Sequence, residues 1–343
     1  MAQITLRNGR VVGDYKQPYF IAELNTSHFG DAEKAFAMID AARTVGCDCV
    51  KFQSWSANSL YSSSYYKANP IARRMIDKFA FTPMMLKEMA RYAQSVGVDF
   101  SSTPYSINEA VFLAEECDVP FIKIASMELN NHRFLREIAQ LGVPVVLSTG
   151  MGTYDEVARA LGVFEKACNP NVAVLHCTSV YPSPPEIIRL RNIGAMRDLF
   201  PSFPSGYSDH SLGSEIAVAA IALGACIIEK HLTLDQNRIG MDNQMATEPD
   251  GMSCMIQQCC NVWRAMGGPE RILCEEEIGQ IPKMRRSLTS TRTLEVGDIL
   301  SYDDLTAKRP GDGIPPNEID SAVGRRIRRR IEADSTIYQD DLD

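Results

Sequence analysis

The sequence predicts a (β/α)8 TIM barrel followed by a small β-rich domain. A short apolar strand and an amphipathic helix alternate eight times before Gly268, over about 250 residues, which is typical of this barrel. Each strand ends in polar residues, as expected where a barrel carries its site at the carboxyl ends of the strands. From Met284 onward the chain changes to short strands and turns. The alternative is a doubly wound open sheet, but no glycine-rich dinucleotide motif follows the first strand.

The chain begins with an alternating segment from Ile4 to Gly13 around Asn8-Gly9. Asn-Gly favours a type I′ turn, so we expect a small hairpin that closes one end of the fold. The barrel strands are then expected at residues 19–25, 49–53, 100–103, 121–126, 145–148, 172–179, 206–210 and 226–231. The clearest helices between them are expected near residues 31–45, 83–96, 108–117, 133–141 and 155–167. Residues 54–81 are rich in Ser and Tyr and too long for a tight connection, which indicates an excursion at the active site.

The stretch from Gly206 to Asp235 is the most informative strand–helix–strand unit. Its first strand ends in Ser208-Asp209-His210 and its second in Glu229-Lys230-His231. Because the ends of neighbouring parallel strands lie side by side, His210 and His231 are expected to face one another and to hold part of a divalent metal's shell. The alternative is two unrelated, hydrogen-bonded histidines.

Composition excludes several classes of protein. No apolar run approaches the roughly 20 residues that span a bilayer, and the N-terminus lacks a signal-peptide core, so we expect a cytoplasmic protein without a membrane partner. The ten cysteines are scattered rather than paired at zinc or disulfide spacings, and we expect them to be reduced. The net charge of −8 argues against nucleic acid as a partner and requires a local cationic pocket for any anionic substrate. The basic run Arg325–Arg330 is better explained as a solvated strand facing an acidic surface, because isoleucines alternate with its arginines.

Polar side chains at the expected strand ends form a ring of candidate site residues. They are Glu23, Asn25, Lys51, Gln53, Thr103, Lys123, Ser126, Glu128, Ser148, Thr149, Ser179, Tyr181, His210 and His231. Lys51 and Lys123 stand out because each lies inside an apolar strand, where an unpaired ammonium is costly. Either each lysine pairs with a barrel carboxylate, or the two form an anion site.

In an anion site, the two lysines and the hydroxyls of Thr103, Ser126 and Ser148 would surround a phosphate. The turn from Ser148 to Gly152 can add backbone N–H donors. A phosphate site beside two histidines indicates metal-assisted chemistry on a phosphorylated small molecule.

Domain boundaries follow from the change from alternating strands and helices to short strands and turns. We expect a hairpin and catalytic barrel over residues 1–268, a linker over residues 269–284 that includes an acidic segment, and a separate small domain over residues 285–343.

Motifs along nearly the whole chain resemble the sialic acid synthase family, the phosphoenolpyruvate-dependent synthases of N-acetylneuraminate and related nonulosonates. These motifs are IAELN, VKFQ, SSTPYS, KIASMELNN, VVLSTGM, LHCTSVYP, GYSDH and IEKHLTLD, then RRSL and AKRPGDGI in the tail. The tail resembles the antifreeze-like (SAF) domain of this family. The resemblance implies condensation of phosphoenolpyruvate with an open-chain N-acetylmannosamine-type sugar, with release of phosphate. It also implies a homodimer in which each tail domain caps the partner's barrel.

The resemblance also implies roles for individual residues. His210 and His231 would bind Mn2+, Mg2+ or Co2+, which polarises the aldehyde. The residues that would hold phosphoenolpyruvate are Lys51, Thr103, Lys123, Ser126 and Ser148. Three residues, Glu128, Glu23 and Arg309, are expected at the catalytic step: Glu128 to activate a water, Glu23 near the carboxylate end or behind the ligands, and Arg309 against the sugar. The other expected sugar contacts are Gln53, Ser179, Tyr181 and Asp242.

Two departures from the family pattern leave the sugar open. Ser179 stands where the N-acetylneuraminate enzymes commonly have Asn, and the segment after His231 reads GMDNQMATEPD; both are expected on the sugar side. A legionaminic or pseudaminic acid synthase, or an enzyme for a sugar 6-phosphate, therefore stays possible. So do a Schiff-base pyruvate aldolase that uses Lys51 or Lys123, and a binding protein whose tail domain recognises ice or a saccharide.

Overall fold

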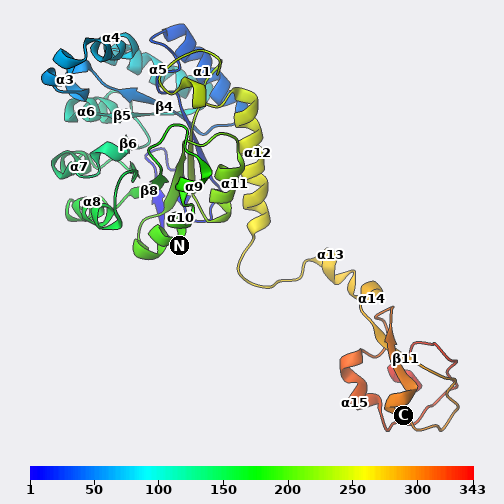
Figure 1. The fold of residues 1–343 in the computed structure, drawn as a ribbon. Coiled ribbons are helices and arrows are strands. Elements are labelled where there is room, and N and C mark those ends of the chain that lie inside the picture. Colours follow the sequence, from blue (N-terminus) through cyan, green and yellow to red (C-terminus); the bar gives the residue numbers. More distant parts are fainter. The chain divides into compact units, whose positions relative to one another are not determined.

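The protein forms two compact units in a computed structural model that describes residues 1–343 (Figure 1). The first unit spans Met1–Gly267 and the second Gly268–Asp343. None of the helices combines the length and the hydropathy that a membrane crossing requires.

The first unit is a barrel of eight parallel strands. The strands are β3 (Tyr19–Glu23), β4 (Cys49–Ser54), β5 (Asp99–Pro104), β6 (Ile122–Ile124), β7 (Val145–Ser148), β8 (Val172–Cys177), β9 (Ser205–Asp209) and β10 (Ile227–His231). They pair in the order β5-β4-β3-β10-β9-β8-β7-β6. The strands β5 and β6 stand at the two ends of this order. No backbone ladder pairs them, but Ser101 Oγ of β5 donates a hydrogen bond to the carbonyl of Phe121, just before β6, at 2.8 Å. The predicted fold class is confirmed.

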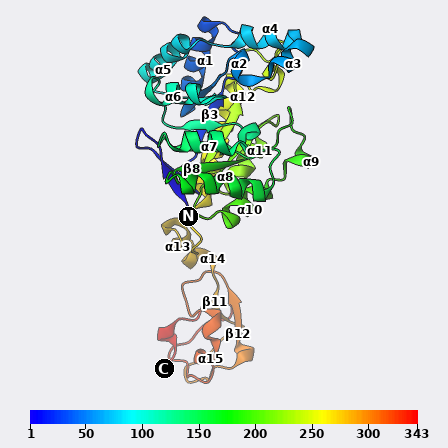
Figure 2. The same ribbon diagram turned by 90° about the vertical axis from the view of Figure 1, so that its left-hand side faces the viewer.

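Both faces of the sheet are covered, which explains the apolar strands. Every strand residue of the barrel is buried except Gln53 and Asp99, as in other parallel sheets packed on both sides. The main helices that surround the strands are α1 (Ala32–Val45), α5 (Pro83–Val96), α6 (Ile107–Glu115), α7 (His132–Ala139), α8 (Tyr154–Lys166), α10 (Arg191–Leu199), α11 (Glu215–Ala222) and α12 (Pro249–Met266). The last helix, α12, contacts both α1 and α11 and so joins the beginning and the end of the series of helices (Figure 2).

Helix ends follow local sequence signals. Asp31 caps α1 by accepting a hydrogen bond from the Lys34 N–H at 3.3 Å, and Gly46 ends the helix at a φ of 91°. One core lies between helices and strands, where Met38, Met89 and Leu135 are fully buried. Truncating such a side chain to alanine costs about 2–5 kcal/mol.

The N-terminal hairpin consists of β1 (Gln3–Thr5) and β2 (Val11–Gly13), as predicted. The expected type I′ turn is wrong, because it requires a positive φ at both central residues. Here the Leu6 N–H bonds to the Arg10 carbonyl at 2.9 Å, and within the loop only Gly9 has a positive φ, 84°. The loop is therefore three residues long. Ile4, Leu6 and Val12 form a core with inward-facing strand residues and close this end of the barrel.

The expected excursion after β4 is present and is helical. It contains α2 (Ala57–Leu60), α3 (Ser63–Ala68) and α4 (Pro70–Phe79). We define the excursion cluster as the buried residues Trp55, Ala57, Tyr66, Ile76 and Phe79. Further short helical segments are η1 (Ser126–Glu128), α9 (Pro185–Ile188) and η2 (Asn243–Met245).

The second unit begins with two short helices, α13 (Glu275–Ile278) and α14 (Ile281–Met284), inside the segment expected as a linker. Its sheet pairs β11 (Ser287–Ser290) with β12 (Leu305–Lys308) in antiparallel fashion, and the chain continues through η3 (Tyr302–Asp304), η4 (Pro316–Glu318), α15 (Ile319–Ala322) and η5 (Gln339–Asp341). Its core is built from aliphatic side chains.

The strand expected at Arg325–Arg330 is wrong. Only isolated bridges form there, at Arg326 and Ile327. Several of its arginines contact acceptors within the same unit: Arg329 pairs with Asp341, and Arg330 Nε lies 3.4 Å from Glu295 Oε1. These arginines therefore form ion pairs within the second unit.

Candidate active site

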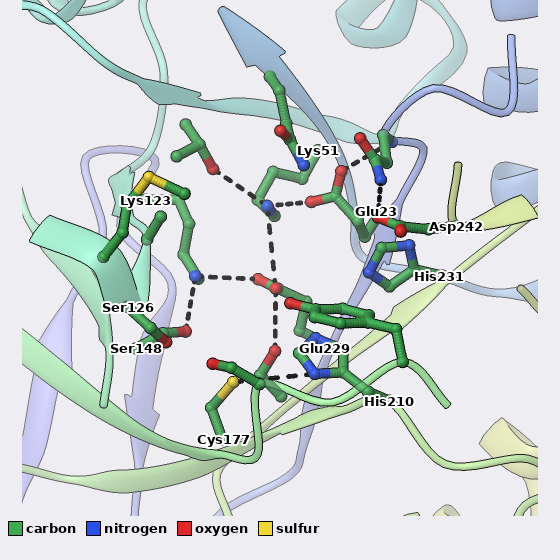
Figure 3. A pocket seen from close by; sticks show the side chains of 18 of the residues that line it. Glu23, Lys51, Lys123, Ser126, Ser148, Cys177, His210, Glu229, His231 and Asp242 are labelled. Carbon is green, nitrogen blue, oxygen red and sulfur yellow. Dashed lines mark hydrogen bonds and ion pairs between the residues drawn. The ribbon is translucent and has the colours of Figure 1, made fainter. Parts of the chain in front are cut away.

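A cavity of about 370 Å³ lies at the carboxyl ends of the barrel strands. Figure 3 shows its charged and polar side chains. The resemblance gave roles to fourteen residues, and twelve of them line the cavity: Glu23, Lys51, Gln53, Thr103, Lys123, Ser126, Ser148, Ser179, Tyr181, His210, His231 and Asp242. Glu128 does not line it, and Arg309 belongs to the second unit.

Lys51 is held at the floor of the cavity by carboxylates. It pairs with Glu23, donates to Thr103 Oγ1 at 3.1 Å, and its Nζ lies 3.8 Å from Glu229 Oε1. Burial alone would lower the pKa of Lys51, but the carboxylates of Glu229 and Glu23 raise it above its ordinary value. Lys51 therefore stays charged although only 3% of it is exposed.

Lys123 has a weaker set of partners. It donates to Ser148 Oγ at 2.7 Å, and its Nζ lies 3.7 Å from Glu229 Oε2. Burial lowers the pKa of Lys123, and Glu229 only partly offsets this effect. Both lysines are thus paired with carboxylates, which was one of the two alternatives, and both face the cavity, as the anion-site alternative requires.

Glu229 links the two lysines, and the sequence analysis did not assign it a role. It also accepts a hydrogen bond from Ser208 Oγ at 3.1 Å. Burial would raise the pKa of Glu229, but Lys123 and Lys51 lower it below its ordinary value. The signal was present in the sequence: alternation along β10 puts Glu229 on the same face as His231.

A niche of hydroxyl groups lies beside the turn after β7. Ser126 Oγ accepts a hydrogen bond from the Gly150 N–H at 2.9 Å. A Cβ at Gly150 would collide with Ser179 Oγ and lie 2.9 Å from Ser126 Oγ, so the approach requires glycine. Ser179 therefore lies beside this niche, and its expected contact with the sugar stays a prediction.

The two histidines are neighbours, as predicted, with His210 directly after β9 and His231 at the end of β10. Their ring centroids are 5.5 Å apart, and the Tyr181 ring lies 4.1 Å from that of His210. His210 Nδ1 bonds to the Thr178 carbonyl at 2.8 Å, which leaves Nε2 as the acceptor nitrogen. His231 Nδ1 is buried without a hydrogen-bond partner.

This donor set fits a divalent metal held by two imidazoles. Burial lowers the pKa of His231 well below its ordinary value, which keeps the ring in the neutral form that binds metal. No group of three or more His, Cys, Asp or Glu side chains forms a complete metal site. The remaining positions would fall to substrate and water.

An amide–carboxylate pair lies at the end of the cavity away from Lys123 and Ser148 (Figure 3). Asp242 accepts a hydrogen bond from the Asn25 side chain. Burial raises the pKa of Asp242. Nearby, Gln53 Oε1 accepts from the Tyr105 hydroxyl at 2.9 Å. Asn25 was in the predicted polar ring but without a role, and its positive φ of 36° holds its amide toward Asp242.

The other two predicted residues are Glu128 and Arg309. Glu128 ends η1, its Oε2 accepts a hydrogen bond from Asn131 Nδ2 at 2.7 Å, and the residue is not among those that line the cavity. Arg309 is exposed in the second unit, where no ion pair or hydrogen bond holds its guanidinium.

Sequence reasoning missed the apolar part of the lining. Its main members are Trp55, Leu60, Tyr61, Ile76 and Met241. Four of them come from the excursion and its entry, whose functional placement was expected but whose individual residues carry no sequence signal beyond their size.

Comparison with known proteins identifies both units. Residues 38–271 match the NeuB family and residues 285–343 match the SAF domain. The chain is 34% identical to N,N'-diacetyllegionaminic acid synthase of Campylobacter jejuni over 94% of this chain and 100% of that protein. It is 33% identical to human N-acetylneuraminate-9-phosphate synthase over 99% of this chain and 97% of that protein.

A solved structure agrees with these relatives. The N-acetylneuraminic acid synthetase of Leptospira borgpetersenii superposes with a TM-score of 0.75 at 30% identity, over 81% of this chain and 95% of that one. The resemblance to sialic acid synthases is therefore confirmed. The chain belongs to the NeuB family of nonulosonic acid synthases and carries a SAF domain at its C-terminal end.

Proposed function

We propose that this protein condenses phosphoenolpyruvate with an open-chain 2-acetamido sugar of the N-acetylmannosamine type, in a metal-dependent reaction. The bond that forms joins C3 of phosphoenolpyruvate to the aldehyde carbon. Water adds its oxygen at C2, the aldehyde oxygen takes up a proton, and inorganic phosphate leaves. The observation that supports this most directly is the pair of buried lysines among hydroxyl groups at the floor of the cavity.

Phosphoenolpyruvate would bind at this floor. Lys123, Ser148 and the niche of Ser126 and Gly150 offer donors to the phosphate, and Lys51 with Thr103 offers donors to the carboxylate. The carboxylates that now hold the lysines keep them extended into the cavity before substrate arrives, which reduces the ordering required on binding.

The metal would be held by His210 and His231. When bound, a divalent ion supplies the positive charge that polarises the aldehyde oxygen. The chain's own contribution is to orient both imidazoles, through the Thr178 carbonyl at His210 and through burial at His231. Tyr181 covers His210 from the open side of the cavity.

Glu128 would activate the water that attacks C2. It would have to exchange its hydrogen bond with Asn131 for the cavity, a short movement because its neighbour Met127 already lines that space. Glu229 is closer to the floor, but the two lysines lower its pKa and make it a poor base. Its proposed role is to balance their charge.

The reaction is tested by phosphate release. Purified protein with Mn2+ and phosphoenolpyruvate should release inorganic phosphate only when a 2-acetamido sugar is added, and mass spectrometry should show the nine-carbon product. No release with any member of a panel of such sugars would exclude the proposal.

A Schiff-base aldolase remains a second candidate because burial lowers the pKa of Lys123. Borohydride with pyruvate separates the two mechanisms. A trapped adduct on Lys123 would support the aldolase, and an unmodified chain supports the metal-dependent synthase.

A further inference from the structure

We infer that a cleft behind the Trp55 side chain is a second ligand site, which takes a small cation with a flat apolar body, such as an arylalkylamine, and which is coupled to the active-site cavity. Ligand binding at the cleft stands apart from the proposed function, and only its effect on the acceptor sugar rests on that function.

The cleft lies between the excursion after β4 and the helices α5 and α6. Its volume is about 440 Å³, within the range of about 300–1,000 Å³ that small-molecule sites have. The excursion contributes residues from its entry and from the end of α4, and the two helices contribute Leu86 and Phe112. Trp55 lines this cleft as well as the active-site cavity, and no other residue lines both. Its side chain is therefore the wall that the two spaces share.

The lining combines apolar rings with negative charge. The buried side chains of Trp55 and Phe81 offer apolar surface. The charged residues of the lining are Asp77 and Glu109, and it contains no Lys, Arg or His. Arg73 Nε lies 3.3 Å from Asp77 Oδ2, but both side chains are about half exposed, so solvent screens this pair. Such a lining favours a cation and disfavours the anions that the active site is proposed to bind.

Glu109 is placed to accept an ammonium group. Its Oε1 accepts a hydrogen bond from Ser59 Oγ, and its Oε2 accepts one from the Tyr105 N–H, both at 2.7 Å. Each carboxylate oxygen has two lone-pair sites, so each can accept one bond more. Burial raises the pKa of Glu109, and a cation in the cleft would favour the charged carboxylate and lower this pKa. A cationic ligand would therefore stabilise this half-buried carboxylate.

The same glutamate connects the cleft to the active site. Ser59 precedes Leu60, which lines the active-site cavity. The Tyr105 hydroxyl donates to Gln53 Oε1 at 2.9 Å, and both residues line the same cavity. Trp55 itself is held by packing alone, because its Nε1 is buried without a hydrogen-bond partner. A ligand that packs against the indole from the cleft therefore changes the contacts that set its position on the cavity side.

Binding is measured on a chain in which Trp55 is the sole tryptophan. The sequence has two tryptophans, so Trp263→Phe leaves the fluorescence of Trp55 as the reporter. The probes are 2-phenylethylamine, the uncharged 2-phenylethanol and the anionic phenylacetate, each added without substrate. We expect the amine to shift the Trp55 emission and to bind about 10-fold more tightly than the alcohol, and more tightly still than the acid. No saturable shift with the amine, or a Kd for the alcohol or the acid as low as that for the amine, would overturn the inference.

Two variants locate the site. In the Trp263→Phe background, Asp77→Asn and Glu109→Gln should each weaken binding of the amine about 5-fold or more and leave binding of the alcohol nearly unchanged. Asp155→Asn is the matched control, because Asp155 is exposed on α8 and lines neither space. Asp77 is exposed, so its replacement decides the matter if the Glu109 variant does not fold. Unchanged affinity for the amine in every variant that folds would overturn the inference.

Coupling is measured with the wild-type chain in the phosphate-release assay. Saturating 2-phenylethylamine should change KM for the acceptor sugar about 3-fold or more. KM for phosphoenolpyruvate should stay the same, because none of the partners of Lys51 and Lys123 lines the cleft. Binding of the amine without any change in KM for the sugar would overturn the coupling. A chain that binds the amine but releases no phosphate with any acceptor would instead overturn the proposed function and leave the second site intact.

Discussion

At the scale of single residues, the site depends on charges that would be unstable alone. Lys51, Lys123, Glu23 and Glu229 are all buried, and each is acceptable only because the others are present. Replacing one of them should therefore affect substrate binding or the stability of the fold, depending on which residue is replaced.

Lys123→Ala should impair binding of phosphoenolpyruvate much more than binding of the sugar. A charge-assisted buried contact of this kind contributes about 2–4 kcal/mol, which would appear as a raised KM for phosphoenolpyruvate. Lys166→Ala, an exposed lysine on α8, is the control and should be silent. Steady-state kinetics with each substrate varied in turn decides, and a defect confined to the sugar would reverse the assignment of the two ends.

The two glutamates should respond differently to replacement by glutamine. Glu128→Gln should lower kcat with nearly normal KM values and unchanged thermal unfolding, because Glu128 is a half-buried residue outside the charged group. Glu229→Gln leaves two buried lysines under-compensated and should destabilise the fold by about 3–5 kcal/mol. Calorimetry beside kinetics distinguishes them; a stable Glu229→Gln protein that has lost only kcat would make Glu229 the base.

Metal removal tests the histidine pair. Because only His210 and His231 are available as protein ligands, we expect modest affinity, loss of activity with a chelator, and recovery with Mn2+, Mg2+ or Co2+. Phosphate release before and after exhaustive chelation measures this. Undiminished activity in the chelated enzyme would show that no metal is needed.

At the scale of elements, β9 and β10 are joined by a buried ion pair next to the two histidines. Asp209 and Lys230 are register partners, and Lys230 Nζ donates to Asp209 Oδ2 at 2.6 Å and to the Ser211 carbonyl at 2.9 Å. Each precedes a histidine in the sequence, so this buried pair fixes the register that brings His210 beside His231.

Breaking this pair on one side should be worse than removing both charges. Lys230→Met leaves the fully buried Asp209 carboxylate without its ion-pair partner and should lower the free energy of unfolding by about 3–5 kcal/mol. Asp209→Asn combined with Lys230→Met should recover part of that loss. Urea unfolding of the two single variants and the double variant gives the coupling energy. Strictly additive losses would mean that the two side chains do not act as a pair.

The elements also show what a sequence can and cannot predict. Strand ends were predictable because a period of two and a polar terminus place side chains at the barrel mouth, as with Lys51 and His231. The close approach of Ser179 to the turn at Gly150 joins segments that are distant in sequence. The orientation of Glu128 depends on a hydrogen bond that Asn131 donates to it, and the place of Leu60 in the cavity lining depends on tertiary packing. None of these contacts has a periodic signature.

At the scale of the whole molecule, we keep the prediction that the tail domain completes the site of a second copy. Arg309 is exposed and unpaired within its own unit, and a segment of about 17 residues from Gly267 to Lys283 is long enough to reach a neighbouring barrel. The mixed dimer of Arg309→Ala with Lys123→Ala should therefore regain activity, because one of its sites has both residues intact.

If each variant alone is inactive and exchange is complete, random re-pairing should restore roughly a quarter of the wild-type activity, since half of the dimers are mixed and each has one intact site. Each variant alone, taken through the same exchange, is the control. No recovery after subunit exchange has been proven, for instance by native mass spectrometry, would mean that each tail serves its own barrel.

The N-terminal hairpin leads us to expect a fixed order of substrate binding and product release. Since Ile4, Leu6 and Val12 close the far end of the barrel, a molecule at the lysine floor has one way out, past the partly exposed rim at Tyr61. Under the proposed function, an acceptor bound above phosphoenolpyruvate would block that path. We therefore expect phosphoenolpyruvate to bind first and phosphate to leave last, so that inorganic phosphate should compete with phosphoenolpyruvate alone.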